Sequence, residues 1–563
     1  MGGARLDDLE PSIDPAHVAS LLGATTETKR YLDHNALFPL RAATTLPHVL
    51  DALAVEGRPL ESLRLIALAD FLDSVDEARA GIRRAAGSFP SLEAVTVDVA
   101  SFKRETGQVR EKIEPSGDVL DSASTELRLI RERLRKQRTR LRGTLESYLR
   151  GKETSKYLQD QVVTERNGRY VLVIKTEHRS AIPGVVHGAS ASGASLFLEP
   201  LSTVEINNDI VALEEQEIEE IRRILLALTD AFRARAPELL RTVDAATVLD
   251  VWQARARFSM LVGGVEPALS TDGAFELQAA RHPLLMPQVL ARLGSESAAT
   301  ARLDQHRPEG SPGTTEGGSG DGDRARVSQS AAAQKGPVPV TIKIVPPATC
   351  LLVTGPNTGG KTVGLKTAGL LAMMAQAGLH VPAADGSRLP VFRSLFADIG
   401  DEQSIDASLS TFSARISNIS AMDRDLAVPA LLLLDEVGSG TDPIEGGALG
   451  VAIVDHFRQR GATVIATSHY DALKAYASTT DGVAGAAFGF EAETFAPTYQ
   501  LVYGTAGRSL ALEIAARLGL NPSVVAAARQ NVSAREAQLA EHLAKIDHDM
   551  RALEHEHRLA ARE

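Results

Sequence analysis

The run from Gly355 to Thr362 restricts how this chain can fold more than any other feature of its sequence. It reads Gly-Pro-Asn-Thr-Gly-Gly-Lys-Thr and fits the pattern G-x-x-x-x-G-K-[ST] in full. Apolar residues 351–354 precede it, and an Ala- and Leu-rich stretch, 362–377, follows it. A strand, a glycine-rich loop and a helix in this order surround phosphate groups with backbone N–H donors. The pattern therefore predicts an α/β domain that binds ATP.

Each residue of this loop has an expected role at the nucleotide. The small glycines let the backbone approach the phosphates, and the helix N-terminus favours their negative charge. Lys361 is expected to neutralise the β- and γ-phosphates, and the hydroxyl of Thr362 is expected to bind Mg²⁺. A glycine-rich turn with an incidental lysine is the alternative, which the strand–loop–helix context disfavours. The predicted nucleotide-binding residues are Gly355, Pro356, Asn357, Thr358, Gly359, Gly360, Lys361 and Thr362.

Two later apolar runs lead into polar side chains of the kind that hydrolyse a phosphoanhydride. Leucines 431–434 precede Asp435 and Glu436, and residues 463–467 are followed closely by His469. Ligands bind at the carboxyl ends of parallel strands. We predict that Asp435 orients Mg²⁺, that Glu436 polarises the attacking water, and that His469 orients water or senses the γ-phosphate. The alternative is that all three are ordinary polar residues at strand ends.

The middle of the chain predicts two long helices of opposite charge. Residues 121–150, which Asp121 or Ser122 could cap, are rich in arginine, and the helix predicted at 208–230 carries glutamates in its first half. Leucines recur every seven residues in the first helix, as in a coiled-coil seam. The charges predict an antiparallel pair. The seam residues are Leu127, Leu134 and Leu141.

Residues between these helices predict a small β-rich tip. Residues 170–174 and 196–198 are apolar strand candidates, separated by glycine and serine. Basic residues flank the first strand, and they are the natural contacts for a nucleic acid. Protection of a solvated strand edge by charge is an equally good interpretation. These basic residues are Arg166, Arg169, Lys175 and Arg179.

Composition limits the compartment and the class of protein. The chain has 563 residues, enough for several domains, and carries a net charge of −12, so any polyanion-binding surface must be local. Its single cysteine, Cys350, excludes an intrachain disulfide and is expected to be buried in a strand. No signal peptide or membrane span is apparent, which predicts a cytoplasmic protein that contacts no membrane.

The nucleotide motifs resemble those of the MutS family, a branch of the ABC-type ATPases. The resemblance covers residues 277–526 and rests on the Pro-Asn after Gly355, on the sequence Asp-Glu-Val-Gly-Ser-Gly-Thr-Asp at 435–442, and on Ala-Thr-Ser-His-Tyr at 466–470. Residues 499–515 resemble the family's dimerisation segment. The transporter signature Leu-Ser-Gly-Gly-Gln is absent. The resemblance implies a homodimer through the ATPase domain, in which Ser410 of a Ser-Thr-Phe motif contacts the partner's γ-phosphate.

The arms and tip resemble the type-two branch of that family. Mismatch-reading members begin with a domain that carries a Phe-x-Glu wedge, whereas Phe197-Leu198-Glu199 lies in the predicted tip, where we interpret it as a chance match. Type-two members usually continue into an Smr nuclease domain, which we do not find before Glu563. We therefore expect no nuclease activity from these residues.

The resemblance implies an α/β P-loop domain of the ABC type and a mainly α-helical core or lever with a helical clamp. It also implies suppression of recombination by an ATP-gated clamp on branched double-stranded DNA. The alternatives are ATP-dependent splitting of stalled ribosomes, which type-two members also suggest, and mechanical work on protein. The expected divisions are a helical core at 1–120, clamp arms and β-rich tip at 121–230, a helical return at 231–270, an ATPase domain at 271–526 with a disordered insert at 295–336, and a charged helix at 527–563.

Overall fold

The computed structural model describes residues 2–85, 87–191, 193–294, 336–355, 360–400, 411–491, 496–504, 512, 515–516 and 519–530. These residues form two compact units, the first mainly Ala36–Asp250 and the second Gly3–Asn35 with Val251–Glu563. The insert predicted at 295–336 lies outside the described residues except for Gly336, and the charged helix predicted at 527–563 does so beyond Gln530. No helix in the described part of the chain combines the length and apolarity that a membrane span requires.

The first unit is built on a helical core. Buried residues from most of its helices form one apolar cluster, which includes Leu68, Phe102 and Phe232. The helices are α3 (Leu46–Leu53), α4 (Ser62–Arg84), α5 (Pro90–Thr96), α6 (Lys103–Lys112), α7 (Thr125–Arg150), α8 (Leu201–Arg233) and the start of α9 (Ala236–Val262), with short 3₁₀ turns η1 (Asp121–Ala123), η2 (Thr154–Tyr157) and η3 (Thr176–His178).

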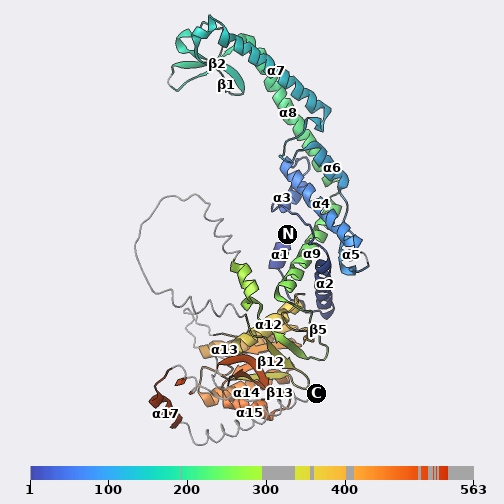
Figure 1. Ribbon diagram of the computed structural model, residues 1–563, viewed down its shortest axis with the longest axis vertical. Helices are drawn as coiled ribbons and strands as arrows, with labels where there is room; N and C mark the ends of the chain where they lie inside the picture. The colour runs from blue at the N-terminus through green and yellow to red at the C-terminus, as the bar shows by residue number, and fades with distance from the viewer. Residues whose placement is uncertain are drawn as a thin grey trace. The chain divides into compact units, whose positions relative to one another are not determined.

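Helices α7 and α8 lie side by side and run antiparallel, as the charge pattern predicts (Figure 1). Arg131 bonds Glu217 at 2.6 Å, and Arg138, further along α7, bonds the earlier Glu214 at 2.6 Å. The three seam leucines of α7 are buried. The predicted cap needs correction: Asp121 and Ser122 form η1, and the hydroxyl of Ser124 instead accepts the N–H of Leu127 at 3.0 Å.

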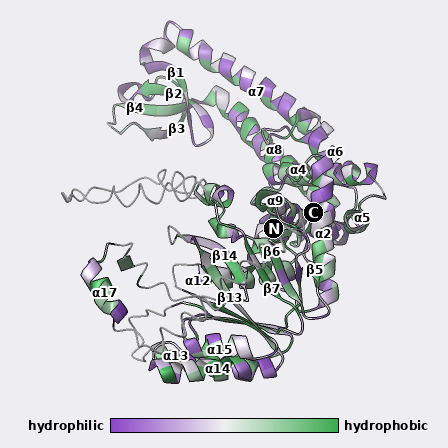
Figure 2. Cartoon of the chain, turned by 60° about the horizontal axis from the view of Figure 1, so that its bottom comes forward, coloured by the Kyte–Doolittle hydropathy of each residue, from purple (hydrophilic) through white to green (hydrophobic). Residues whose placement is uncertain are grey.

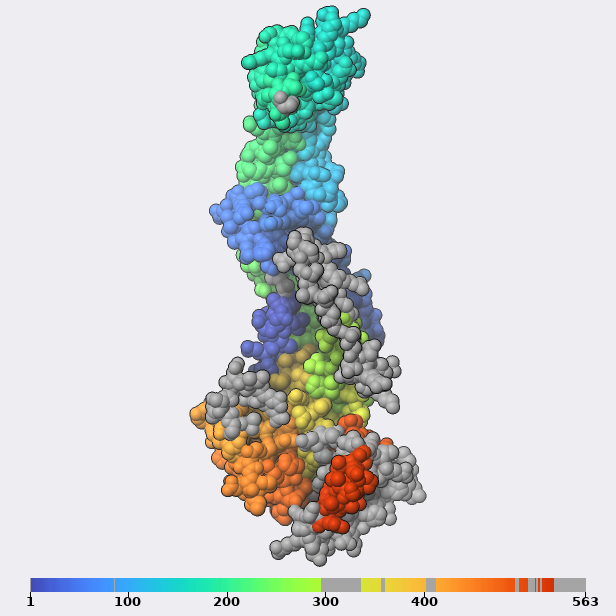
Figure 3. All heavy atoms as spheres, turned by 90° about the vertical axis from the view of Figure 1, so that its left-hand side faces the viewer, coloured from blue at the N-terminus to red at the C-terminus, as the bar shows by residue number. Residues whose placement is uncertain are grey.

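The tip at the end of these helices is a four-stranded antiparallel sheet, compact in Figure 3 (teal). Its strands are β1 (Leu158–Arg166), β2 (Arg169–Lys175), β3 (Gly184–Ala189) and β4 (Ser195–Pro200), in the order β1-β2-β4-β3. Strands β2 and β4 contain the two predicted strands. Asn167 and Gly168 join β1 to β2 with φ of 51° and 72°. This Asn-Gly pair suits a two-residue hairpin because both positions need positive φ.

The second unit contains a six-stranded sheet in the order β10-β11-β12-β8-β13-β14 and a four-stranded sheet in the order β5-β9-β6-β7. In the larger sheet every neighbouring pair is parallel except β13 with β14. The strands are β5 (Ala268–Leu269), β6 (Phe275–Ala280), β7 (Val340–Ile344), β8 (Cys350–Thr354), β9 (Arg388–Leu389), β10 (Ser394–Asp398), β11 (Ala430–Leu434), β12 (Ala462–Ser468), β13 (Val483–Phe490) and β14 (Pro497–Tyr503).

Helices cover both faces of the larger sheet. Leu351 and Val353 of β8 face the helix α12, whereas Cys350 and Leu352 face the opposite apolar cluster, to which α14 and α15 contribute. Cys350 is buried, as predicted, and burial raises the pKa of its thiol to about 12. The helices are α1 (Gly2–Asp7), α2 (Pro15–His34), α12 (Lys361–Gln376), α13 (Thr411–Asp425), α14 (Pro443–Gln459), α15 (Asp471–Thr479) and α17 (Pro522–Gln530), with the turn η4 (Pro283–Leu285).

Residues 3–35 group with the second unit, whereas the sequence assigns them to one core at 1–120. The reason is a set of hydrogen bonds to the end of α12. Thr25 donates to the carbonyl of Gly378 at 2.7 Å, and Gln376 donates to the carbonyl of Ser12 at 2.9 Å. Both partners are distant in sequence, so no local pattern indicates this docking.

Candidate functional site

The phosphate loop leaves β8 at Gly355 and enters α12 at Lys361. Gly360 caps the helix with φ of 97°, a conformation that favours glycine. Lys361 is 1% exposed, and its Nζ has no hydrogen-bond partner among the described residues. Burial lowers the pKa of this ammonium below its ordinary value, and the nearby carboxylates of Glu436 and Asp435 offset only part of that shift. An unpaired buried ammonium costs free energy, so this side chain is arranged for an anion.

Asp435 lies beside the start of α12, at the carboxyl end of β11. Thr362 donates from Oγ1 to Asp435 Oδ2 at 2.7 Å, and Thr467 of β12 donates to Asp435 Oδ1 at 2.5 Å. Asp435 is 5% exposed. Three segments that are far apart in sequence thus meet at one carboxylate, because β8, β11 and β12 are parallel and end at the same sheet edge.

Glu436 follows with a left-handed backbone, φ 49°. Such a conformation costs a residue with a side chain about 1–3 kcal/mol, so it persists only where neighbours hold it. The N–H of Glu436 donates to Thr467 Oγ1 at 2.8 Å. The hydroxyl of Thr467 therefore holds the carboxylate of Asp435 and the main chain of Glu436, a role that the sequence analysis missed. The sequence signal for Thr467 is its position at the end of a predicted strand, directly before Ser468 and His469.

His469 lies at the same edge of the sheet. It follows Ser468, which pairs with Thr354, the residue before Gly355. The His469 side chain is exposed, and its ring centroid lies 4.4 Å from that of Tyr470. The structure thus places Lys361, Thr362, Asp435, Glu436 and His469 around one edge. Pro356, Asn357, Thr358, Gly359 and Ser410 lie outside the described residues.

The described residues fit a nucleotide with Mg²⁺. The Nζ of Lys361, for which the described residues provide no hydrogen-bond partner, matches phosphate oxygens. The hydroxyl of Thr362 with the carboxylate of Asp435 matches the oxygen ligands that Mg²⁺ prefers. The oxygen ligands would hold the ion, and Lys361 would hold the phosphates.

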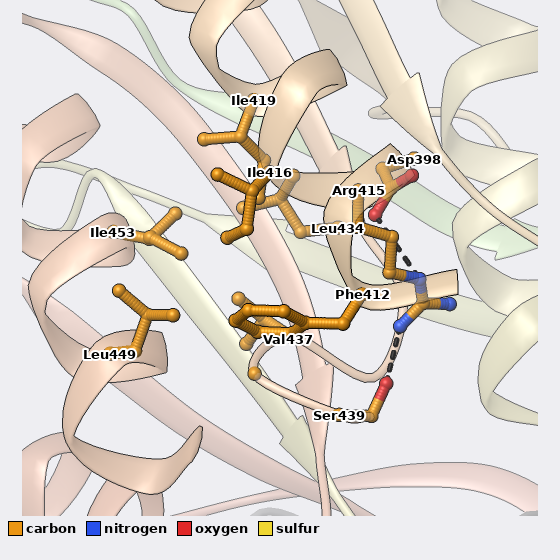
Figure 4. Close-up of a pocket in the computed structure, with 11 residues that line it drawn as sticks. Asp398, Phe412, Arg415, Ile416, Ile419, Leu434, Val437, Ser439, Leu449 and Ile453 are labelled. Carbon is orange, nitrogen blue, oxygen red and sulfur yellow. Dashed lines mark hydrogen bonds and ion pairs between the residues drawn. The ribbon is translucent and has the colours of Figure 1, made fainter. Parts of the chain in front are cut away.

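Arg415 of α13 is a second residue that the sequence analysis missed. Its Nη1 donates to the backbone carbonyl of Glu436 at 3.2 Å and to the hydroxyl of Ser439, and its Nε lies 3.7 Å from Asp398 Oδ2 (Figure 4). The guanidinium is largely buried, with 16% of the side chain exposed. Its place on a helix of mixed polarity gives no signal of this contact with Glu436.

The predicted nucleic-acid contacts of the tip do not form one cluster, because β2 separates them. Lys175 and Arg179 lie at its far end, and Arg179 is exposed. At the near end, Arg166 stacks on the ring of Phe197 at 4.3 Å, and Arg169 donates to Glu199 at 2.7 Å.

Glu199 explains the Phe-x-Glu match as a structural feature of the tip. Its side chain is 1% exposed and also accepts bonds from His187 at 2.6 Å and from Asn207 at 2.8 Å. Because Asn207 lies on α8, this buried carboxylate fastens the tip sheet to the arm. A glutamate with these partners is not free to contact a ligand.

The outer face of α7 carries a further basic surface. Arg131 and Arg138 form ion pairs with glutamates of α8. Five other cations of α7 are exposed and make no ion pair among the described residues. Figure 2 shows α7 as mostly hydrophilic (purple). We call these cations the α7 basic face: Arg128, Arg133, Lys136, Arg140 and Arg142.

Comparisons with known proteins place the sequence around this site in a known family. Residues 351–536 match the family model described as MutS domain V. A protein named Endonuclease MutS2 from Symbiobacterium thermophilum is 38% identical over 553 residues, which is 98% of this chain and 63% of that protein. Proteins of that name from Pelotomaculum thermopropionicum (39% over 508 residues, 90% and 59%) and Geobacillus kaustophilus (38% over 556 residues, 98% and 65%) are similar. The chain thus spans less than two thirds of these relatives. It belongs to the MutS family, in the type-two branch to which these relatives belong.

Proposed function

We propose that this chain is an ATP-hydrolysing clamp that binds branched double-stranded DNA and suppresses recombination. The observation that carries the ATPase is the buried ammonium of Lys361, which has no hydrogen-bond partner among the described residues and lies in the site that the Thr362–Asp435 pair forms. Membership of the MutS family and the α7 basic face support the proposed binding of nucleic acid. The names of the relatives describe endonucleases, and we place no nuclease step on the residues described here.

The proposed hydrolysis assigns one task to each side chain at the sheet edge. Lys361 neutralises the charge that develops on the transferred phosphoryl group. Thr362 and Asp435 hold Mg²⁺, which supplies positive charge to the phosphates when bound. Glu436 accepts a proton from the attacking water, and His469 orients that water or senses the γ-phosphate. The hydroxyl of Thr467 positions the Asp435 carboxylate and the Glu436 main chain relative to each other.

The proposed DNA contacts come from the clamp. The α7 basic face offers phosphate-binding groups that no described carboxylate neutralises, and Arg166, Lys175 and Arg179 add cations at the tip. Arg169 is held by Glu199, so we assign it a supporting role in the tip as well as any phosphate contact. Contacts of this kind bind the backbone of a duplex and carry no sequence preference.

Replacing Arg133, Lys136 and Arg140 with glutamine is expected to weaken binding to branched DNA more than tenfold at moderate salt. Each lost phosphate contact should reduce the slope of log K against log salt by about 0.9. The measurement is fluorescence anisotropy with a four-way junction across a salt series. Replacing the exposed Arg83, Arg84 and Arg104 of α4 and α6 with glutamine removes equal charge outside the clamp and should change the slope little.

Ribosomes assayed beside the junction test the alternative function. Preferential, ATP-dependent binding and splitting of stalled ribosomes, with weak junction binding, would replace the DNA proposal with the ribosomal one. An equal loss of junction binding in both triple variants would show that the α7 basic face is not the contact.

We also propose that two chains form composite ATP sites, with Ser410 of one chain at the γ-phosphate held by the other. Helix α13 begins at Thr411, directly after Ser410. A hydroxyl at a helix start suits a phosphate, because backbone N–H groups and the helix dipole add positive potential there. ATP would then favour closure of the dimer.

Mixing Ser410→Ala and Lys361→Ala chains is expected to restore part of the ATPase activity that each lacks alone. One site of the mixed dimer would contain intact groups from both chains. The measurement is steady-state phosphate release after subunit exchange. Exchange is verified by mixing each variant with the unmodified chain, and absence of recovery under those exchanging conditions would contradict the assignment of Ser410 in trans.

A further inference from the structure

We propose that Arg415 is a positioning residue for ATP hydrolysis, which holds the main chain of Glu436 and joins it to helix α13. This inference rests on the proposed ATPase function. It concerns a residue that does not touch the nucleotide but acts through the carboxylate that we assign as the base.

The apolar face of α13 fixes where Arg415 points. Phe412, Ile416 and Ile419 recur at the i, i+4 and i+7 spacing of one helix face and line the same pocket as Leu434, Val437 and Ile453 (Figure 4). This packing ties the helix to the end of β11 and the residues after it. Arg415 lines the same pocket, and Figure 4 shows its guanidinium reaching toward the loop that carries Ser439.

The guanidinium then connects two loops of the sheet edge. Its Nη1 donates to the Glu436 carbonyl at 3.2 Å and to the hydroxyl of Ser439, which belongs to the loop after β11. On its other side Nε faces Asp398 at 3.7 Å, and Nη2 lies 3.5 Å from the carbonyl of Gly400, after β10. Only a planar group with several fixed donors can serve these acceptors together, and a lysine ammonium presents a different geometry.

Glu436 is the residue that needs this support. Its left-handed backbone, φ 49°, is unfavourable for a residue with a Cβ. The N–H of the residue is held by Thr467 at 2.8 Å, and its carbonyl accepts Arg415 and the N–H of Ser439, the latter at 3.0 Å. Since the direction of a side chain follows from its backbone, holding both ends of Glu436 directs its carboxylate. Without Arg415 one of these supports is lost.

The same contact links Glu436 to the start of helix α13. Arg415 lies one helical turn from Thr411, where α13 begins. A shift of this helix would therefore move the support of Glu436.

Arg415→Ala is expected to lower kcat for ATP about 10- to 100-fold, the size of effect that misplacement of a reacting group produces, while ATP affinity changes less than about threefold. Arg415→Lys should recover little activity, and free guanidinium ion added to Arg415→Ala should recover part of it. In a Glu436→Gln background, Arg415→Ala should cause no further loss, since both changes act through one carboxylate.

The matched control is Arg458→Ala on α14. Arg458 is similarly buried, at 22% exposed, and likewise bonds a carboxylate, of Asp455 at 2.8 Å, and a backbone carbonyl, of Asp481 at 3.2 Å. Thermal unfolding of both variants separates loss of stability from loss of positioning. A kcat for Arg415→Ala equal to that of Arg458→Ala, or an equal further loss in the Glu436→Gln background, would overturn the role of Arg415. Absence of hydrolysis by the unmodified chain would instead overturn the proposed ATPase.

Discussion

Replacing Lys361 with methionine is expected to reduce ATP hydrolysis by more than about 1000-fold, since loss of one group that stabilises transition-state charge already costs about 100- to 1000-fold and Lys361 also binds the phosphates. The nucleotide-free variant should be at least as stable as the unmodified chain. In the unmodified chain Lys361 is 1% exposed, and its ammonium has no partner among the described residues. The folded chain therefore bears a desolvation cost that a methionine of similar length removes.

Thermal unfolding with and without Mg²⁺–ATP measures both parts of this prediction. Ligand at 100 times its Kd stabilises a folded protein by about 2.7 kcal/mol, and this increment should vanish in Lys361→Met. Lys366→Met, an exposed residue of the same helix, is the control and should retain hydrolysis and the ATP-dependent increment. A variant that is strongly destabilised without nucleotide would show that Lys361 has an unrecognised structural partner.

Replacing Glu436 with glutamine is expected to preserve ATP binding and to slow hydrolysis about 100- to 10,000-fold, the range that a general base contributes. Glutamine has nearly the same shape, and the backbone contacts to Thr467 and Arg415 do not involve the replaced carboxylate. The ATP-bound state should then accumulate as a closed dimer. Single-turnover hydrolysis, together with light scattering in the presence of ATP, measures both effects.

Glu445→Gln is the matched control for this variant. Glu445 is an exposed carboxylate at the start of α14, on the segment that follows the same strand, so its replacement should leave turnover intact. If ATP binding and hydrolysis fell together in Glu436→Gln, Glu436 would have to be a ligand of the metal or a structural group. If Glu436→Gln bound ATP normally but formed no closed dimer, slow hydrolysis would not be sufficient for dimer closure.

Local sequence patterns predicted most of the elements because their causes are local. The seven-residue spacing of Leu127, Leu134 and Leu141 follows from helix geometry, and all three are buried in clusters that include residues of α8. Apolar residues before Asp435 indicate a central strand because such a strand is buried on both faces. The cap at Ser124 was missed by a few residues because Asp121, Ser122 and Ser124 all have side chains that can cap a helix.

The buried strands and the charged arms can be predicted from local sequence patterns, and the residues proposed to hold ATP come from a local motif. Which groups support them depends on contacts that form only in the folded chain. Thr467 reaches Asp435 and Glu436 from a neighbouring strand, Arg415 reaches Glu436 from a helix, and Glu199 binds Arg169 across the tip. These contacts join residues 21 to 32 positions apart. Periodicity and capping act over a few residues, whereas such contacts depend on which strands become neighbours and where they end.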